Sequence, residues 1–487
     1  MIKYLVVLLW PVAAAAHPAA SQAADYPASM FGIRSDGVTL NTRSIQYAVD
    51  YIHDKGGGKL VFDVGRYLTG SIHLRSGVGL ELKEGAVLLG SLNPFDYDKD
   101  GFTALLLADS VRDISISGRG VIDGQGRAVA AAIVGLARSG VIHDPLQHDR
   151  PNEANRPMLI YFRHCSEVAL KDITLANAAS WVETYDQCSG LTIDSIRVDS
   201  KAYWNNDGMD VVDCSQVKIT GCTIDAADDG ICLKSHDPAA ACTDVLIRDC
   251  TIRSSANAIK FGTVSRGGFR KIRILHNRVY NTYRSALALE AVDGAVIQDV
   301  LADSLTAVNT GNALFVRIGA RSGSRESKIA GVTIRHFSIE IAAAKADSGY
   351  PYEGPIEDQP RNISPMVLTG LPGALLQDIR LEDVTVRYPG GGNAFIASRG
   401  LTDSVPELPA NYPEFSMFRE LPAWGLYFRH ARGIQVKNLR LFCAARDYRT
   451  AIVLDDVEGG TWEGTVVKEP GNKKVFFLKG SSGVGMK

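Results

Sequence analysis

A pattern of about 25 residues recurs along this chain and constrains its fold more than any other feature. The clearest copies begin at Cys165, Cys188, Cys214 and Cys242, and they align position for position. Each copy alternates apolar and polar residues in two short runs that are separated by a polar corner, which is the pattern of two short strands. Such a strand pair cannot bury its own apolar face, but stacked copies share one interior. The repeat therefore predicts a solenoid.

The predicted fold class is all-β, a single-domain right-handed parallel β-helix with an N-terminal capping helix and long loops. Leucine-rich repeats have a similar period but need a Leu-x-x-Leu-x-Leu spacing that these copies lack. The right-handed sense follows from the general preference of parallel crossovers. Residues 41–54 have helical spacing, with Thr42 as the expected cap and glycines 56–58 as the end. Insertions at 127–156, 342–372 and 387–430 are expected to project as loops.

The N-terminal sequence indicates where the protein is located, and the overall charge excludes some classes of partner. Residues 1–23 contain Lys3, an apolar run and a small-x-small site, which predicts a secretory signal peptide followed by one β-helix domain over 24–487. We therefore expect a secreted or periplasmic protein. With 52 Lys and Arg against 54 Asp and Glu, no basic field exists to attract nucleic acid or anionic lipid. No later apolar run is long enough to span a membrane, and a monomer is expected.

Six of the eight cysteines occupy two register positions of the repeat, Cys165, Cys188, Cys214 and Cys242 in one and Cys222 and Cys250 in the other. Stacked neighbours in one register position would lie within disulfide reach, and buried thiols that only pack are equally compatible with that placement. Packing is the preferred interpretation for most of them. A line of single cysteines along an axis does not build a tetrahedral metal site.

A second register carries the chemistry. Its copies begin at Asp207, Asp229, Asn257, Ser285 and Asn312, with steps of 22, 28, 28 and 27 residues. Strand alternation places the fourth and sixth positions of each copy on an outer face. That face is expected to collect the side chains of Asp210, Lys234, Lys260, Glu290, Phe315 and Arg317.

Three carboxyl groups, those of Asp207, Asp228 and Asp229, are predicted to converge on two adjacent rungs. Like charges at short range destabilise a fold, so a purely structural role is the weaker explanation. They suit glycoside hydrolysis, in which one protonated carboxyl donates to the leaving oxygen and another deprotonates water. Calcium binding by the same oxygens is the alternative. We expect no metal and no other cofactor.

The spacing of these residues resembles that of a known family. Asn205-Asn-Asp207-Gly-Met-Asp210, followed 21 residues later by Asp228-Asp229-Gly, is similar to the paired motifs of glycoside hydrolase family 28, the polygalacturonase family. The resemblance extends over nearly the whole chain after residue 23. It implies a right-handed β-helix that hydrolyses glycosidic bonds with inversion and without a metal. It also implies that Asp228 is the general acid, that Asp207 and Asp229 activate water, and that Asn205 positions that group.

Two family motifs are missing. The Gly-His-Gly motif falls on Ala256-Asn257-Ala258, and the Arg-Ile-Lys motif, which grips a substrate carboxylate, falls on Ala288-Leu289-Glu290. We therefore predict that Lys260 takes over the binding of an acidic sugar; a cross-rung ion pair with Glu290 is the alternative. Trp181 either stacks on a sugar ring or packs as a core aromatic. Asn257 is expected mainly to hydrogen-bond backbone. The predicted substrate-binding residues are Asn205, Lys260, Asn257, Trp181, Glu290 and Arg317.

The predicted function is an exported, inverting glycoside hydrolase that acts on pectic polysaccharide, in the manner of an exo-acting polygalacturonase. Exo action is inferred from the large insertions, which could wall off an open groove. A pectin-degrading polysaccharide lyase on the same fold is one alternative, and it would need Ca²⁺ and a basic residue. A non-catalytic carbohydrate-binding solenoid is another, although convergent acids are not expected in it. The partner is a pectic, acidic polysaccharide or oligosaccharide.

Overall fold

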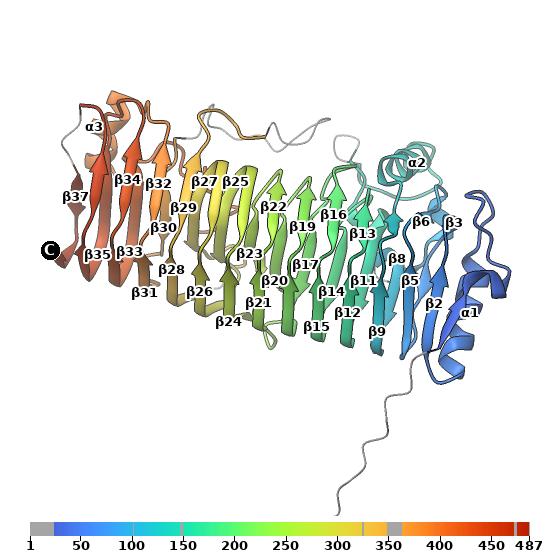
Figure 1. Cartoon of the computed structure of the whole chain (residues 1–487). Coiled ribbons are helices and arrows are strands. Elements are labelled where there is room, and N and C mark those ends of the chain that lie inside the picture. Colours follow the sequence, from blue (N-terminus) through green and yellow to red (C-terminus); the bar gives the residue numbers. More distant parts are fainter. Residues whose placement is uncertain are drawn as a thin grey trace, which may run out of the picture.

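The computed structural model describes residues 24–100, 102–146, 150–323, 326–347, 363–471 and 475–486. Over these residues the chain winds as one continuous row of parallel strands, from the N-terminal helix α1 to the C-terminal strands (Figure 1). The predicted signal peptide, residues 1–23, and part of the predicted 342–372 loop lie outside the described residues.

The strands stack into three parallel sheets, and each turn of the chain, or rung, passes through sheets I, II and III in order. The repeat registers stack as predicted, since Val168 pairs with Ile114 on one side and Leu191 on the other. The first register supplies the strands of sheets I and II, and the second register supplies sheet III. These observations confirm the predicted fold class, a right-handed parallel β-helix.

The strand bounds follow the three sheets. Sheet I contains β1 (Asp25–Pro27), β2 (Gly58–Phe62), β5 (Val78–Leu82), β9 (Arg112–Ser117), β12 (Ser166–Lys171), β15 (Ser189–Asp194), β18 (Ser215–Thr220), β21 (Cys242–Arg248), β24 (Gly268–Leu275), β26 (Val296–Asp303), β28 (Lys328–Arg335), β31 (Leu376–Glu382) and β38 (Ser482–Met486). Sheet II contains β3 (Gly65–Thr69), β6 (Ala86–Gly90), β10 (Val121–Asp123), β13 (Thr174–Ala176), β16 (Arg197–Ser200), β19 (Thr223–Ala226), β22 (Thr251–Ser254), β29 (Ser338–Ile341), β32 (Thr385–Tyr388), β34 (Arg440–Cys443) and β36 (Val466–Lys468). Sheet III contains β4 (Ile72–His73), β8 (Phe102–Asp109), β11 (Met158–Arg163), β14 (Glu183–Asp186), β17 (Met209–Val212), β20 (Ile231–Ser235), β23 (Ile259–Ser265), β30 (Met366–Thr369) and β37 (Phe476–Lys479). Four longer strands bend from one sheet into the next: β25 (Arg278–Ala291) and β27 (Thr306–Ile318) from II to III, and β33 (Ala423–Lys437) and β35 (Thr450–Glu463) from III to I. The short strand β7 (Lys99–Asp100) pairs antiparallel with β8.

The polar corner between sheets I and II has a backbone reason. Asp172, Ser195, Gly221 and Asp249 occupy this corner on four successive rungs, with φ values of 59°, 56°, 64° and 54°. Left-handed backbone is tolerated by Gly, Asn and Asp and is unfavourable for β-branched residues. The interior next to the corner is apolar and fully buried, as with Ile173 and Val198, and each such side chain contributes roughly 1.5–3 kcal/mol.

Helix α1 (Thr42–Asp54) covers the N-terminal end of the solenoid, as predicted. It buries Ile45, Ala48, Val49 and Ile52. The predicted cap was wrong by one residue, because Asn41 is the N-cap and Thr42 is the first helical residue. Thr42 Oγ1 instead accepts a hydrogen bond of 2.8 Å from the backbone of Gly70 and ties the helix to the next segment.

The insertions are not loops throughout. The 127–156 insertion contains most of α2 (Gly126–Arg138), and the 387–430 insertion contains α3 (Ala394–Thr402). Three short 3₁₀ turns complete the helical elements, η1 (Ala28–Phe31), η2 (Pro94–Asp96) and η3 (Glu153–Asn155). No helix among the described residues has the length and apolar character that crossing a membrane requires.

Residues 403–421, called the covering segment below, lie over the outer face of sheet III. Phe415, Phe418 and Leu421 from this segment form an apolar cluster with Phe315 and Val367 of the solenoid. The backbone of Ala320 also donates to the Pro409 carbonyl over 2.8 Å. The segment therefore closes this face of the solenoid on the C-terminal side of β23.

All eight cysteines lie within the described residues and are free and buried. Their thiols donate to backbone carbonyls, for example from Cys165 Sγ to the Arg163 carbonyl at 3.2 Å. The preferred interpretation of packed thiols is confirmed.

Candidate active site

A cleft of about 260 Å³ lies on the outer face of sheet III, over the rungs of β17, β20 and β23. The three predicted catalytic carboxyl groups, Asp207, Asp228 and Asp229, all line it. Three of the predicted substrate-binding residues, Trp181, Asn205 and Lys260, line it as well. The structure thus brings together most of the residues that the sequence singled out.

The stacking of rungs places the acids. Asp207 and Asp229 each lie two residues ahead of a sheet III strand, and those strands pair Met209 with Ile231. The backbone of Gly208 donates to the Asp229 carbonyl over 2.8 Å, and Gly230 donates to the Asn257 carbonyl over the same distance. The corners are therefore in register, and the first position of each copy stacks on the next.

Asp229 is held in its ionised form. Its Oδ1 accepts two hydrogen bonds of 2.9 Å from Asn257, one from the backbone and one from Nδ2, and its Oδ2 lies 3.0 Å from Lys260 Nζ. Burial opposes ionisation, but the charges of Lys260 and Lys234 and the Asn257 hydrogen bonds outweigh it and lower the pKa of Asp229 to about 2. A carboxylate in this state can accept a proton from water.

Asp207 has the opposite environment. It is 5% exposed, and its Oδ2 lies 3.1 Å from Lys234 Nζ, which also contacts Oδ1 of the fully buried Asp210. Burial first, and then the neighbouring Asp210, Asp228 and Asp229 charges, raise the pKa of Asp207 well above its usual range against the pull of Lys234. Burial raises the pKa of Asp210 to about 6. One ammonium therefore bridges two carboxyl groups whose pKa values are both raised.

Asp228 lies beside these groups and is only partly buried. Its Oδ1 accepts the backbone N–H of Asp229 over 2.9 Å. The cleft thus holds one carboxylate that two cations keep ionised, Asp229, beside a carboxyl group whose pKa is raised, Asp207. Carboxyl groups whose environments separate their proton affinities in this way are what acid–base hydrolysis of a glycosidic bond requires.

Lys260 is not placed as a free receptor for a substrate carboxylate. It is 2% exposed, and its ammonium lies 3.0 Å from Asp229 Oδ2, 3.1 Å from the Tyr412 hydroxyl and 3.9 Å from Glu290 Oε2. The cross-rung ion pair with Glu290 is present, although Asp229 is the nearer partner. Burial raises the pKa of Glu290 to about 7.

The remaining predicted binding residues have structural partners. Asn257 fixes Asp229 and also accepts from the backbone of Ser285 over 3.2 Å. Arg317 does not reach the cleft; it is buried under the covering segment, where it donates to the carbonyls of Glu407 and Leu408. Trp181 is partly buried, and Lys234 Nζ lies 4.3 Å from its ring centroid.

Asn205 lines the cleft in left-handed backbone, with φ of 54°. Its Oδ1 accepts a hydrogen bond of 2.8 Å from Arg156 and another from Arg150. Arg156 also donates to the carbonyls of Pro151, Ala179 and Trp204. The insertion that carries both arginines therefore fixes Asn205 in the wall of the cleft.

Several cleft residues were not among the predicted site residues. Lys234 lines the cleft, and the buried Asp210 contacts it from behind; both occupy the predicted outer-face register, so their periodic position was a usable signal. Tyr412 and Arg321 line the cleft from insertions, where no periodicity locates a side chain.

Metal binding is the remaining possibility for these acids. Asp207, Asp229 and Cys232 offer ligand atoms within 4.8 Å of one another. Both carboxylates already pair with ammonium groups, of Lys234 and Lys260, and a cation would have to displace them. This donor set does not fit Ca²⁺, which takes six to eight oxygen ligands.

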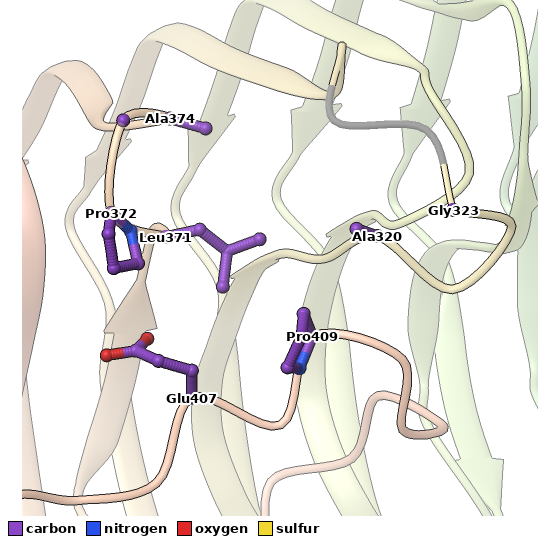
Figure 2. A pocket seen from close by; sticks show the side chains of 8 residues that line it. Ala320, Gly323, Leu371, Pro372, Ala374, Glu407 and Pro409 are labelled. Carbon is purple, nitrogen blue, oxygen red and sulfur yellow. The ribbon is translucent and has the colours of Figure 1, made fainter.

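A second pocket, of about 460 Å³, lies between the covering segment and two turns of the solenoid (Figure 2). Ala320, Leu371, Pro372 and Pro409 give it a largely apolar lining, and Glu407 supplies a carboxyl group. That carboxyl group already binds Arg429 and His430. The pocket lacks the convergent acids of the cleft, so the cleft is the candidate active site.

Comparison with known proteins agrees with this assignment. The model of glycosyl hydrolases family 28 matches residues 64–238. A probable polygalacturonase from Vitis vinifera is 25% identical over 327 residues, 63% of this chain and 60% of its own length. An exo-poly-alpha-D-galacturonosidase from Dickeya chrysanthemi is 24% identical over 247 residues, 42% of this chain and 40% of its own length. The chain thus spans three fifths or less of these two curated relatives.

A solved structure shares the fold. The hyperthermoactive exopolygalacturonase from Thermotoga maritima superposes with a TM-score of 0.60 at 21% identity, over 75% of this chain and 87% of its own.

Proposed function

We propose that the chain is a member of glycosyl hydrolases family 28, whose model matches residues 64–238, and that it is a glycosidase that hydrolyses pectic polysaccharide. The observation that carries the proposal is the convergence of Asp207, Asp228 and Asp229 in one cleft, where Lys260 lies 3.0 Å from Asp229 Oδ2 and keeps that carboxylate ionised. The relatives named as polygalacturonases support the substrate class.

We assign the inverting mechanism to three residues. Asp228, the most accessible of the acids, donates a proton to the leaving glycosidic oxygen. Asp229 takes a proton from the water that attacks the anomeric carbon from the opposite face. Because burial and the neighbouring carboxylates raise the pKa of Asp207, its task is to orient that water, and Asn205 borders the site.

Cleavage from a chain end is the second part of the proposal. The covering segment packs on sheet III beyond β23, and Tyr412 from this segment reaches Lys260 in the cleft. A polysaccharide that lies along the sheet would meet this wall one rung after the catalytic acids. The relative named as an exo-acting enzyme supports this mode of action.

Export belongs to the proposal as well. The predicted signal peptide supports a secreted or periplasmic protein, in which a polymeric substrate is accessible. We propose that the protein acts there as a monomer.

Product analysis by mass and by NMR on a panel of pectic oligosaccharides tests the proposal. Wild-type protein should release single terminal units with inverted anomeric configuration, and Asp228→Asn should release none. Unsaturated products that disappear with a chelator would instead identify a lyase. Tight binding without any product would indicate a carbohydrate-binding solenoid, and either result would overturn the proposal.

A further inference from the structure

The cations of the cleft are all committed to protein carboxylates. Among the described residues, those that line it are Lys234, Lys260 and Arg321. Arg321 donates to both oxygens of Asp293, over 3.0 and 2.6 Å. Lys234 bridges Asp207 and Asp210. None of the three charges is left without a protein counter-ion.

The closed end of the cleft is the end where Tyr412 of the covering segment contacts Lys260. The pairing of cations with protein carboxylates is clearest there. Lys260 lies there between Asp229, Glu290 and the Tyr412 hydroxyl, so three protein oxygens already surround its ammonium group. Glu290 is 1% exposed and places a carboxyl group at a position where a cation would be needed to bind a carboxylate. Carboxyl groups outnumber cations around the closed end itself: Asp229, Glu290, Asp293 and Glu414 against Lys260, Arg321 and Arg284.

We infer that the sugar unit bound at the closed end of the cleft is uncharged. The inference rests on the proposed function and narrows its substrate to pectic chains whose terminal unit carries no carboxylate. Galactose and methyl-esterified galacturonate meet this condition, whereas free galacturonate does not. This replaces the predicted role of Lys260 as a receptor for an acidic sugar.

The expected discrimination is large. One uncompensated negative charge about 6 Å from a substrate carboxylate, at an effective dielectric constant of about 20, disfavours binding on the order of 100-fold. Burial of both partners keeps this effect at physiological salt.

Three series of pectic oligosaccharides that differ only in the terminal unit test the inference. The unit is galactose, methyl-esterified galacturonate or galacturonate, and each series is prepared with the unit at either chain end. The readouts are kcat/KM from released product, and Kd from calorimetry with the inactive Asp228→Asn variant. Glu290→Gln removes one negative charge at the closed end, and Glu458→Gln is the matched control because Glu458 is exposed and pairs with Arg432.

We expect wild-type kcat/KM on both uncharged ends to exceed that on the galacturonate end on the order of 100-fold. Glu290→Gln should abolish most of this ratio, and Glu458→Gln should leave it unchanged. Equal or faster cleavage of the galacturonate end would overturn the inference. If no oligosaccharide is hydrolysed, the proposed function fails, but calorimetry still tests the inference. Tighter binding of the oligosaccharides with uncharged ends supports it. Equal binding of all three series, tighter binding of the galacturonate end, or no binding overturns it.

Discussion

The ion pair between Lys260 and Asp229 gives the most direct test of the site. Lys260→Met removes the ammonium and keeps a side chain of similar length. A shift of the Asp229 pKa from 3.8 to about 2 corresponds to about 2 kcal/mol of stability. Because the variant leaves a buried carboxylate without its partner, the total loss at neutral pH should be about 3–5 kcal/mol.

The loss has a defined pH dependence. In the wild type the folded-state pKa of Asp229 is lowered, so its contribution is present above the unfolded value of 3.8 and disappears as pH falls toward about 2. In the variant burial raises that pKa, so the penalty is present at high pH and absent once the carboxyl is protonated. Both effects make the deficit largest near neutral pH and smallest in acid.

Thermal unfolding at about pH 7 and about pH 3 measures the difference. An unfolding entropy of about 1 kcal/mol/K for a chain of this length converts the loss to about 3–5 °C at neutral pH. Lys218→Met is the control, because Lys218 is exposed on β18, and it should change stability by less than about 0.5 kcal/mol. A Lys260→Met deficit that is the same at both pH values would refute the reasoning.

Three further predictions concern other parts of the cleft. Asp228→Asn should lower kcat by about 10²–10⁴-fold with little change in oligosaccharide affinity, as measured by steady-state kinetics and calorimetry. Tyr412→Ala should open the closed end, so that mass analysis finds products longer than one unit; unchanged single-unit release would show that the covering segment does not set product length. Arg156→Met should release Asn205 from the cleft wall, raise KM and destabilise the protein by roughly 3 kcal/mol, since several buried acceptors lose their donor. A fall in stability without a change in KM would limit Arg156 to a structural role.

The fold could be predicted because its signal is periodic. Apolar residues recur at the same register position, as with Val168 and Leu191, often enough to predict the strands, their stacking and the buried face. The polar corner was visible in the same way. The cap of α1 was misplaced by one residue because Asn41 and Thr42 are both good caps, and only the contact with Gly70 separates them.

The site could be predicted in part, for the same reason. Asp207 and Asp229 lie in the repeat, so their convergence followed from the register. The contacts of Lys260 could not be predicted from the register, because its partner Tyr412 comes from an insertion 152 residues away in sequence. Arg317 has the expected register position but lies under the covering segment, and contacts made by an irregular segment leave no periodic signal. Because these side chains are buried, the charged groups that were expected to be free on the outer face form ion pairs instead.

The corner between sheets I and II has a consequence for mutational scans of this chain. Asp172, Gly221 and Asp249 are solvent-exposed there, yet their positive φ values exclude most replacements, and valine or isoleucine most strongly. A scan would record intolerant surface positions at intervals of one rung, far from the cleft. Such a row of intolerant positions resembles the result expected for a binding surface. If these positions accept Gly and Asn but not Val, the cause is the positive φ of the backbone and not a bound partner.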